Sequence, residues 1–327
     1  MEHCEPSFLP PATVAILQLG RLGDMILTTP LFRAVKECWP GAALTVIALE
    51  HSALIAQHHP SVDAVVSVPF GILQLPTLAR RLHRKSFDLY IDPKDHRSST
   101  SRVVAEFIRA KHRVGCRANG GRETFDQTFE PPDQPLHYVD RMLRPLQLLH
   151  PERSFARRPL LGVPTESLRV ADGQMLPGEH GAIAINISAG STSRHWGLEH
   201  WEELIDEVSK KYSVAVISSP EDRHHADAIC STSRQARPVT TNTILDAAAI
   251  VARSRAVVSP DTSIVHIASA FNRPVVGLYP PNHGNLATFG PLSDRQAVLM
   301  PAPEAELSTI PFRQVVEGLG KVMAERQ

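Results

Sequence analysis

Asp24 is an acidic residue placed where it could accept a proton from a substrate. It ends a loop that follows an apolar run, made of Gly20, Arg21, Leu22, Gly23 and Asp24. The two glycines let the backbone turn sharply and approach a ligand closely. A helix that begins here keeps a carboxylate ionised through its dipole and free N–H groups, which suits a general base. Two alternatives stay open: Asp24 only caps the helix, or the helix begins at 28–30 and Asp24 lies in an exposed turn.

A second loop follows a later apolar run and combines small residues, hydroxyls and a cation. Its members are Ser188, Ala189, Gly190, Ser191, Thr192, Ser193 and Arg194. Backbone N–H groups, hydroxyls and a guanidinium are the donors that a diphosphate needs. The loop therefore suggests a phosphate site, and the alternative is an ordinary solvated turn.

A third loop leads into a helix, and it contains Asp261, Thr262 and Ser263. Free N–H groups at the start of that helix can hold an anion. His266 falls about one turn inside, where it could reach the same ligand. The alternatives are that Asp261 is the helix N-cap and that His266 is a buried, hydrogen-bonded histidine.

Several other chemistries find no support in the sequence. There is no DxD pair, and neither the histidines at 51–59 nor the pair at 224–225 has a matching carboxylate pattern, so we expect no metal. The GxGxxG and GxxxxGK[ST] phosphate motifs and the GxSxG hydrolase motif are absent as well. Phosphate binding is then expected to fall to protein groups alone.

The composition is that of a globular protein with no excess charge. The chain has 327 residues, 34 Lys plus Arg, 34 Asp plus Glu and 43% hydrophobic residues. No apolar run approaches the roughly 18 residues of a membrane span, and the N-terminus lacks the pattern of a signal peptide. The four cysteines, Cys4, Cys38, Cys116 and Cys230, form no CxxC pair. We expect a cytoplasmic protein.

Positive charge is concentrated in one segment. Between Arg80 and Arg122 there are 12 Lys or Arg and 4 Asp or Glu. This excess suits an anionic acceptor or an acidic membrane surface, and the alternative is a solvated helix face. Nucleic acid is not expected, because Phe87, Tyr90 and Phe107 are the aromatic residues there and no known binding module is present.

These loops are positioned by short apolar runs that alternate with helix-length segments, the pattern of an α/β fold with parallel sheets. We predict strands at 13–19, 44–49, 63–68, 87–92 and 112–116, and again at 182–187, 213–218, 256–259 and 274–279. The proline- and glycine-containing segment 150–181 is predicted to be a linker. Two domains are expected, 1–160 and 161–327, and one continuous large sheet is the alternative.

Taken together, segments 14–40, 186–205 and 259–279 resemble the ADP-heptose:lipopolysaccharide heptosyltransferase family, glycosyltransferase family 9. The resemblance implies a GT-B architecture: two Rossmann-like doubly wound domains facing a central cleft. The first would bind the acceptor and the second the nucleotide sugar, and the C-terminal helix can then pack back on the first domain. It also implies an inverting transfer without metal, with Asp24 as general base.

The resemblance assigns further residues to the donor site. Ser188, Gly190, Ser191 and Thr192 match the family's phosphate loop, and Asp261, Thr262, Ser263 and His266 match its DTG-x-x-H motif. Two residues depart from the family pattern. Arg194 stands where lysine is usual, and Ser263 replaces the glycine of the motif. Both changes keep phosphate binding chemically reasonable.

The expected function is transfer of heptose, or a related sugar, from ADP-heptose to an anionic lipopolysaccharide-core acceptor. No cofactor or metal is expected besides the substrate ADP-sugar, and a peripheral contact with the inner face of the cytoplasmic membrane is a further expectation. Two rival functions stay open: a nucleotide-binding protein of the same fold without transfer activity, and an epimerase of nucleotide sugars.

Overall fold

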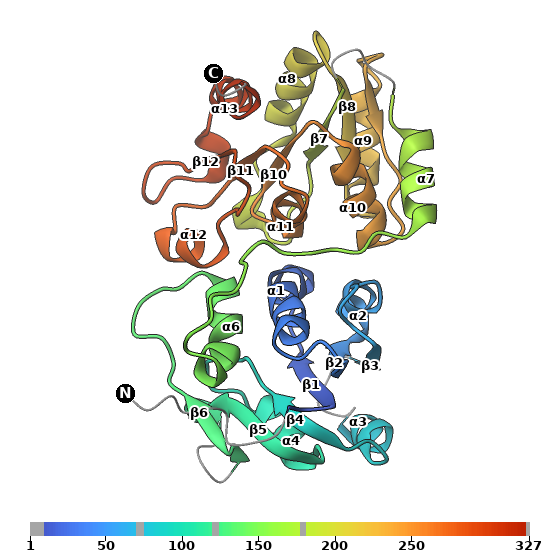
Figure 1. Cartoon of the computed structure of the whole chain (residues 1–327). Helices are drawn as coiled ribbons and strands as arrows, with labels where there is room; N and C mark the ends of the chain where they lie inside the picture. Colours follow the sequence, from blue (N-terminus) through green and yellow to red (C-terminus); the bar gives the residue numbers. More distant parts are fainter. Residues whose placement is uncertain (1–9, 70–74, 120–123, 177–180, 325–327) are drawn as a thin grey trace. The chain divides into compact units, whose positions relative to one another are not determined.

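Each half of the chain folds around its own parallel sheet (Figure 1). The computed structural model describes residues 10–69, 75–119, 124–176 and 181–324. The chain divides into two units, Met1–Gly162 and Val163–Gln327. The alternative of a single continuous sheet is therefore wrong. Cys4 and Arg122 lie outside the described residues.

The sheet of the first unit has six strands in the order β3-β2-β1-β4-β5-β6, all of them parallel. The strands are β1 Thr13–Gln18, β2 Ala43–Leu49, β3 Ala64–Val68, β4 Phe87–Ile91, β5 Ala110–Cys116 and β6 Gln127–Phe129. The helices are α1 Leu22–Cys38, α2 Glu50–Gln57, α3 Leu75–Leu82, α4 Ser99–Phe107 and α6 Tyr138–Leu149. Helix α1 contacts both α2 and α6, and α3 contacts α4. When helices cover a parallel sheet, its strands appear in the sequence as runs of buried apolar residues.

Helix α1 begins at Leu22 and continues through Pro30, so the predicted alternative start at 28–30 is wrong. Pro30 has no N–H to donate to the carbonyl of Ile26 four residues earlier. The hydroxyl of Thr29 donates to that carbonyl instead, at 2.7 Å. The same hydroxyl accepts the N–H of Leu160 at 2.9 Å. These bonds let one helix carry Asp24 in its first turn.

The second unit repeats the same topology, with the order β12-β11-β10-β7-β8-β9. Its strands are β7 Ala182–Asn186, β8 Ser213–Ile217, β9 Ala236–Pro238, β10 Ala256–Pro260, β11 Val275–Leu278 and β12 Gln296–Leu299. Its helices are α7 Thr165–Gln174, α8 Leu198–Ser209, α9 Arg223–Cys230, α10 Ile244–Arg253, α11 Ser263–Ala270, α12 His283–Phe289 and α13 Phe312–Met323. The C-terminal helix α13 packs on α8, β11 and β12 of this unit.

The predicted linker 150–181 is wrong in part, because it contains α7. This helix packs on α10, where the hydroxyl of Ser167 donates to Asp246 at 2.7 Å. Arg253 of α10 also pairs with Asp172 at 2.7 Å. Because these partners are far apart along the chain, no local sequence pattern predicts their contacts. The sequence also missed strands β6, β9 and β12 and helix α12, because three to seven residues carry too little periodicity.

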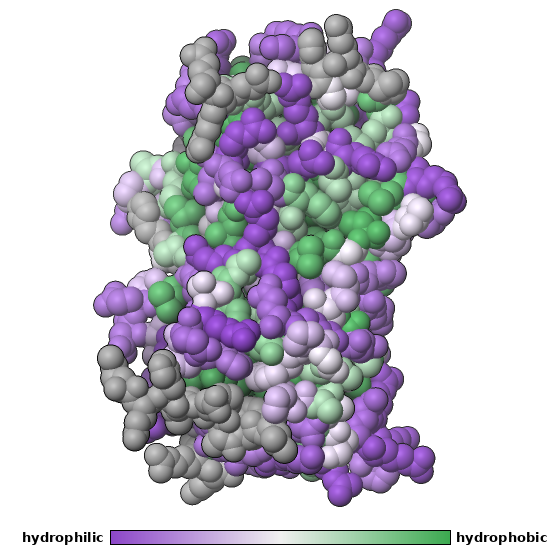
Figure 2. Space-filling view, viewed as in Figure 1, coloured by the Kyte–Doolittle hydropathy of each residue, from purple (hydrophilic) through white to green (hydrophobic). Residues whose placement is uncertain are grey.

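On the face shown in Figure 2, hydrophilic residues cover most of the surface and apolar residues form smaller groups. The large apolar side chains that stay exposed in the described part of the chain are Phe107, Leu148, Val170 and Leu198. Within the described residues, no helix is both long and apolar enough to cross a membrane.

Candidate functional site

Both sheets reverse their strand order at one place, between β1 and β4 in the first unit and between β7 and β10 in the second. Open α/β sheets bind ligands outside the carboxyl ends of the strands at such a switch point. The Asp24 loop follows β1. The 188–194 loop follows β7, and Asp261 follows β10. The fold therefore brings the candidate loops of each unit to its switch point.

At the first switch point, Asp24 is the third residue of α1 and is half-buried. One oxygen of its carboxylate accepts the N–H of Arg21 at 2.9 Å. Gly20 lies so close that an added Cβ would come within 2.6 Å of the Cβ of Asp24. Position 20 therefore requires glycine, because the side chain of Asp24 lies too close for a Cβ there. Asp24 therefore takes part in capping the helix, and its carboxylate keeps further lone pairs for a second role.

Gln18, the last residue of β1, ties this loop to the helices around it. Its side-chain oxygen accepts the N–H of Gly20 at 2.8 Å, and its amide nitrogen donates to the hydroxyl of Thr28 at 2.5 Å. Thr28 in turn donates to the backbone oxygen of Asp24 at 2.7 Å. Gln18 also forms a side-chain hydrogen bond with Tyr138 of α6. The position of Asp24 is thus fixed by a buried polar network.

The charge state of Asp24 is set by opposing influences. Burial raises the pKa of its carboxyl above the usual range. The hydrogen bond from Arg21 and the positive charges of Arg21, Lys94 and Arg141 oppose that rise. Asp24 is therefore a carboxyl group with increased proton affinity, as a general base requires.

Two more carboxyl groups follow β4 beside the same loop. Asp95 is buried and accepts two hydrogen bonds from Arg141, at 2.6 and 2.5 Å. Burial raises the pKa of Asp95, but the pairing with Arg141 outweighs burial and the net direction is down. Asp92 is fully buried, and burial raises its pKa to about 6. The first switch point thus holds three carboxyl groups with different proton affinities.

The second switch point is organised by Asn186, the buried last residue of β7. Its amide nitrogen donates to the backbone oxygen of Ser188 and the hydroxyl of Ser259, both at 3.0 Å. The same nitrogen reaches the hydroxyl of Thr262 at 3.2 Å. The hydroxyl of Ser188 accepts the N–H of Ser219 at 2.7 Å. These bonds bring the second and third predicted loops together.

Arg194 and Asp261, both predicted from the sequence, contact each other. The guanidinium of Arg194 donates to the backbone oxygen of Asp261 at 2.9 Å and lies 3.3 Å from its carboxylate. Asn285 of α12 donates to the same carboxylate at 2.6 Å. Burial raises the pKa of Asp261, and Arg194 and Asn285 oppose that rise. Asp261 therefore holds the cation in a fixed orientation at the start of α11.

The N-cap of α11 is Thr262, whose hydroxyl accepts the N–H of Ile264 at 3.3 Å, so the interpretation of Asp261 as the cap is wrong. Ser263 is the first residue of the helix. His266 is buried one turn later, with its ring 6.5 Å from that of Phe289. The sequence placed His266 correctly along the helix, and its burial agrees with the alternative of a core histidine.

The middle of the 188–194 loop is exposed. Gly190, Ser191 and Thr192 are open to solvent, and a Cβ added at Gly190 would meet no atom within 4 Å. The hydroxyls of Ser191 and Ser193 lie 3.1 Å apart. The structure therefore packs both ends of this loop and leaves its polar middle accessible.

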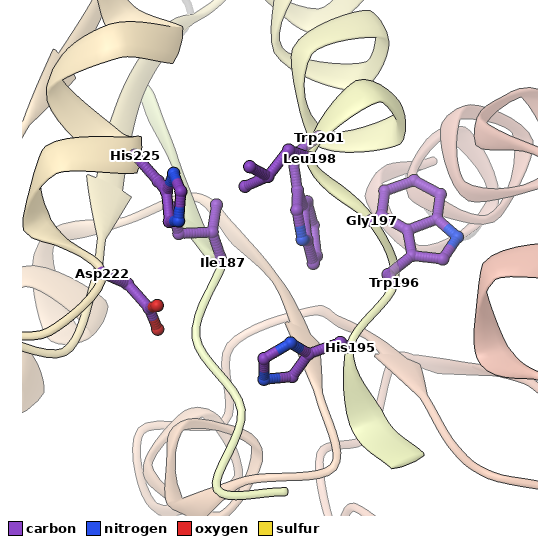
Figure 3. Close-up of a pocket in the computed structure, with 8 residues that line it drawn as sticks. All are labelled: Ile187, His195, Trp196, Gly197, Leu198, Trp201, Asp222 and His225. Atoms are coloured by element: carbon purple, nitrogen blue, oxygen red, sulfur yellow. The ribbon is translucent and has the colours of Figure 1, made fainter. Parts of the chain in front are cut away.

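A cavity of about 160 Å³ lies at the two ends of this loop (Figure 3). It is lined by Ile187, His195, Trp196, Gly197, Leu198, Trp201, Asp222 and His225. The ring of Trp196 packs at 4.5 Å against that of Trp201, and its N–H donates to the backbone oxygen of Ile310 at 2.8 Å. Asp222 accepts the hydroxyl of Ser219, the residue that contacts Ser188. The cavity walls thus anchor the loop at both ends.

The described cations of the basic segment 80–122 lie at both ends of the sheet. Lys94 follows β4 near Asp24, and its amine donates to the hydroxyl of Ser98 at 3.2 Å. The exposed Lys85 precedes β4, and the N–H of Phe87 donates to the backbone oxygen of Arg109 just before β5. Lys85 and Arg109 therefore lie at the amino end of the sheet, away from Asp24. Of these three cations, only Lys94 lies near the Asp24 loop.

Sequence reasoning missed several residues that build these sites: Gln18, Asp92, Asp95, Tyr138, Arg141, Asn186 and Asn285. One signal was available, because Gln18 and Asn186 are single amides that end apolar strand runs. Arg141 and Asn285 carry no such signal, since they lie on helices far along the chain from their partners. Among the described residues, no group of three or more His, Cys, Asp or Glu is placed to hold a metal ion.

Solved structures with the same fold cover nearly the whole chain. A glycosyl transferase family 9 protein from Veillonella parvula is 18% identical, covers 95% of this chain and 97% of its own, and gives a TM-score of 0.83. The E. coli heptosyltransferase WaaC with ADP is 20% identical, covers 95% of this chain and 99% of its own, and gives 0.75. Likeness at this identity shows the fold, and the two Rossmann-like units are those of the GT-B class.

Sequence comparison identifies the family within that class. A profile of glycosyltransferase family 9 (heptosyltransferase) matches residues 76–309, and the chain belongs to this family. It is 25% identical over 311 residues to lipopolysaccharide heptosyltransferase 2 of Escherichia coli K12, and 85% of each chain is covered. The resemblance seen in the sequence is thereby confirmed, and the protein is a glycosyltransferase.

Proposed function

We propose that this chain is an inverting, metal-independent heptosyltransferase that moves heptose from ADP-heptose to an anionic lipopolysaccharide-core acceptor, with Asp24 as general base. Family membership and the names of its relatives support the donor and acceptor classes. The observation that carries the mechanism is the placement of Asp24, a half-buried carboxyl at the carboxyl end of β1. This position is where an α/β sheet binds its ligand.

In the proposed reaction, the carboxylate of Asp24 takes the proton of an acceptor hydroxyl. The oxygen then forms a bond to the anomeric carbon from the face opposite the diphosphate, and the bond from that carbon to the phosphate oxygen breaks. Attack from the opposite face inverts the configuration. The raised proton affinity of Asp24 supports this role, because a base closer in pKa to the working pH transfers protons more efficiently.

The leaving ADP gains negative charge that protein groups must stabilise. Arg194 supplies a positive charge, Ser188, Gly190, Ser191 and Thr192 supply hydroxyl and N–H donors, and the start of α11 at Thr262 and Ser263 supplies free N–H groups. His266 and Asp261 complete the proposed donor site, with Asp261 holding Arg194 in place. These groups support phosphate binding without a metal ion.

The acceptor side carries its own cations. Gly20, Arg21 and Gly23 form the loop around Asp24, and Lys94 and Arg141 are close enough to act on its charge. Positive groups beside the base suit an acceptor that carries carboxylate or phosphate groups. The exposed cations Lys85 and Arg109, at the amino end of the same sheet, support the separate proposal of a peripheral contact with an acidic membrane at the cytoplasmic side.

The test is a turnover assay with ADP-heptose and a heptose-free lipopolysaccharide core, with and without EDTA. We expect ADP release that needs the acceptor, resists EDTA and yields a product of inverted anomeric configuration. Conversion of the donor without acceptor would instead identify an epimerase. Binding of ADP with no turnover of either substrate would identify a nucleotide-binding protein. Retention of configuration or loss of activity in EDTA would overturn the proposed mechanism.

A further inference from the structure

Asp95 and Arg141 form a charged pair of the first unit in which the carboxylate is almost fully buried, and the reaction above uses only the positive charge of Arg141. The guanidinium and the carboxylate share two hydrogen bonds, at 2.6 and 2.5 Å. The side chain of Asp95 is 1% exposed and that of Arg141 is 20% exposed. Two parallel bonds of this kind fix the orientation of a guanidinium as well as its place.

The pair stands beside Asp24 because α6, which carries Arg141, packs on α1, which carries Asp24. The ring of Tyr138, one turn earlier in α6, lies 5.5 Å from the guanidinium carbon of Arg141. Asp95 follows β4, the strand across the switch point from β1. Helix α1, helix α6 and the segment after β4 therefore meet near Asp24. The guanidinium of Arg141 contacts Tyr138 of α6 and Asp95 of the segment after β4.

We propose that Asp95 and Arg141 form a positioning pair for Asp24: Asp95 fixes the guanidinium of Arg141, and Arg141 keeps the carboxylate of Asp24 charged for proton abstraction. The inference rests on the proposed role of Asp24 as base. Asp95 also limits the positive field, because its own charge offsets that of Arg141. Among the described residues, Arg21, Lys94 and Tyr138 also interact with the charge of Asp24.

The two members of the pair should act on Asp24 in opposite directions. Arg141→Gln removes a positive charge and leaves Asp95 unbalanced, so the pKa of Asp24 should rise by up to about one unit. Asp95→Asn leaves the guanidinium unbalanced, so the pKa of Asp24 should fall. The double variant removes both charges and should return it close to the wild-type value. A charged pair too far from Asp24 to act on it would leave the pKa of Asp24 unchanged in both single variants.

The measurement is the titration of Asp24 by NMR in protein labelled with ¹³C at the Asp carboxyl carbon, with its signal identified by its loss in Asp24→Asn. The matched control is Arg253→Gln, which breaks the two-bond pair with Asp172 in the second unit and should leave the titration unchanged. The acidic limb of the pH–rate profile with ADP-heptose should move in the same order as the titrations.

Each result has a separate meaning. Equal titrations in the wild type, Arg141→Gln and Asp95→Asn would overturn the positioning pair while leaving the proposed base in place. Shifts of opposite sign with full turnover retained in Asp24→Asn would overturn the proposed function, and with it any catalytic task for the pair. Opposite shifts together with an inactive Asp24→Asn would support both.

Discussion

The two switch points have the same topology and different chemistry. In each unit an amide ends the first strand, Gln18 in one and Asn186 in the other, and it links the following loop to a threonine, Thr28 or Thr262. Around this shared frame, the first unit places three buried or half-buried carboxyl groups. The second places hydroxyls and a guanidinium that is paired with the buried carboxyl group of Asp261. We propose that this shared frame serves proton transfer in one unit and anion binding in the other.

Asp24→Asn should give the largest loss of turnover among the variants that test this difference between the two switch points. Loss of the base should reduce turnover by about 10²- to 10⁴-fold while ADP affinity stays near the wild-type value. Turnover with ADP-heptose and calorimetric ADP binding measure the two quantities. The control is Glu50→Gln, which changes an acid in the first turn of α2. Turnover retained in Asp24→Asn would show that the first switch point does not supply the base.

The two loop glycines should respond differently to alanine. At Gly20 the new Cβ would collide with Asp24 at 2.6 Å, and at Gly190 it would meet nothing within 4 Å. Since a small displacement of a catalytic group can cost about 10²-fold, Gly20→Ala should lower turnover by up to that factor. Gly190→Ala should leave ADP affinity and turnover nearly unchanged. Equal losses in both variants would contradict the difference in packing.

The carboxyl groups at the two ends of β4 should give stability changes of opposite sign. The pKa of Asp92 is raised to about 6, so its unfavourable ionisation lowers stability as pH rises from about 4 towards 7. Asp92→Asn should therefore raise the free energy of unfolding at pH 7 by about 3 kcal/mol, and by little at pH 4.

Asp88, at the amino end of the strand, is the matched control for that measurement. Hydrogen bonding to Lys111 lowers the pKa of Asp88 to about 2. Ionised Asp88 therefore adds to the free energy of unfolding above about pH 4, and this stabilisation is lost as the pH falls through 2. Asp88→Asn should thus destabilise the protein at pH 7. Urea unfolding at both pH values measures the two variants. Destabilisation by Asp92→Asn at pH 7 would contradict the assigned burial penalty.

The smallest of these effects concerns the second switch point. Arg194→Ala should weaken ADP binding about tenfold, the loss expected for one or two hydrogen bonds to a charged group. Arg194→Lys should lose less ADP affinity than Arg194→Ala because it keeps the positive charge. It should still bind ADP more weakly than the wild type, because lysine cannot form the bidentate contact of arginine. Arg234→Ala, an exposed change in the same unit, serves as control. Unchanged ADP affinity in Arg194→Ala would remove the guanidinium from the phosphate site.

The sequence predicted the parts of the fold that depend on local pattern. The buried runs of β1, β2, β7 and β8 were found within one or two residues, because continuous apolar segments between loops are typical of parallel strands. Short edge strands were missed. The helix α7 was mistaken for linker, since its packing on α10 depends on residues about 80 positions away along the chain.

The sequence alone determined the two-unit α/β class, the three loops at strand ends and the family, because these follow from local periodicity and residue order. Only the tertiary structure decided which residues surround those loops. Arg141 meets Asp95 and Asn285 meets Asp261 because folding brings together residues that are 46 and 24 positions apart along the chain. Burial then shifts the proton affinities of Asp24 and Asp92. Such shifts depend on solvent exclusion by the whole fold, which no short segment encodes.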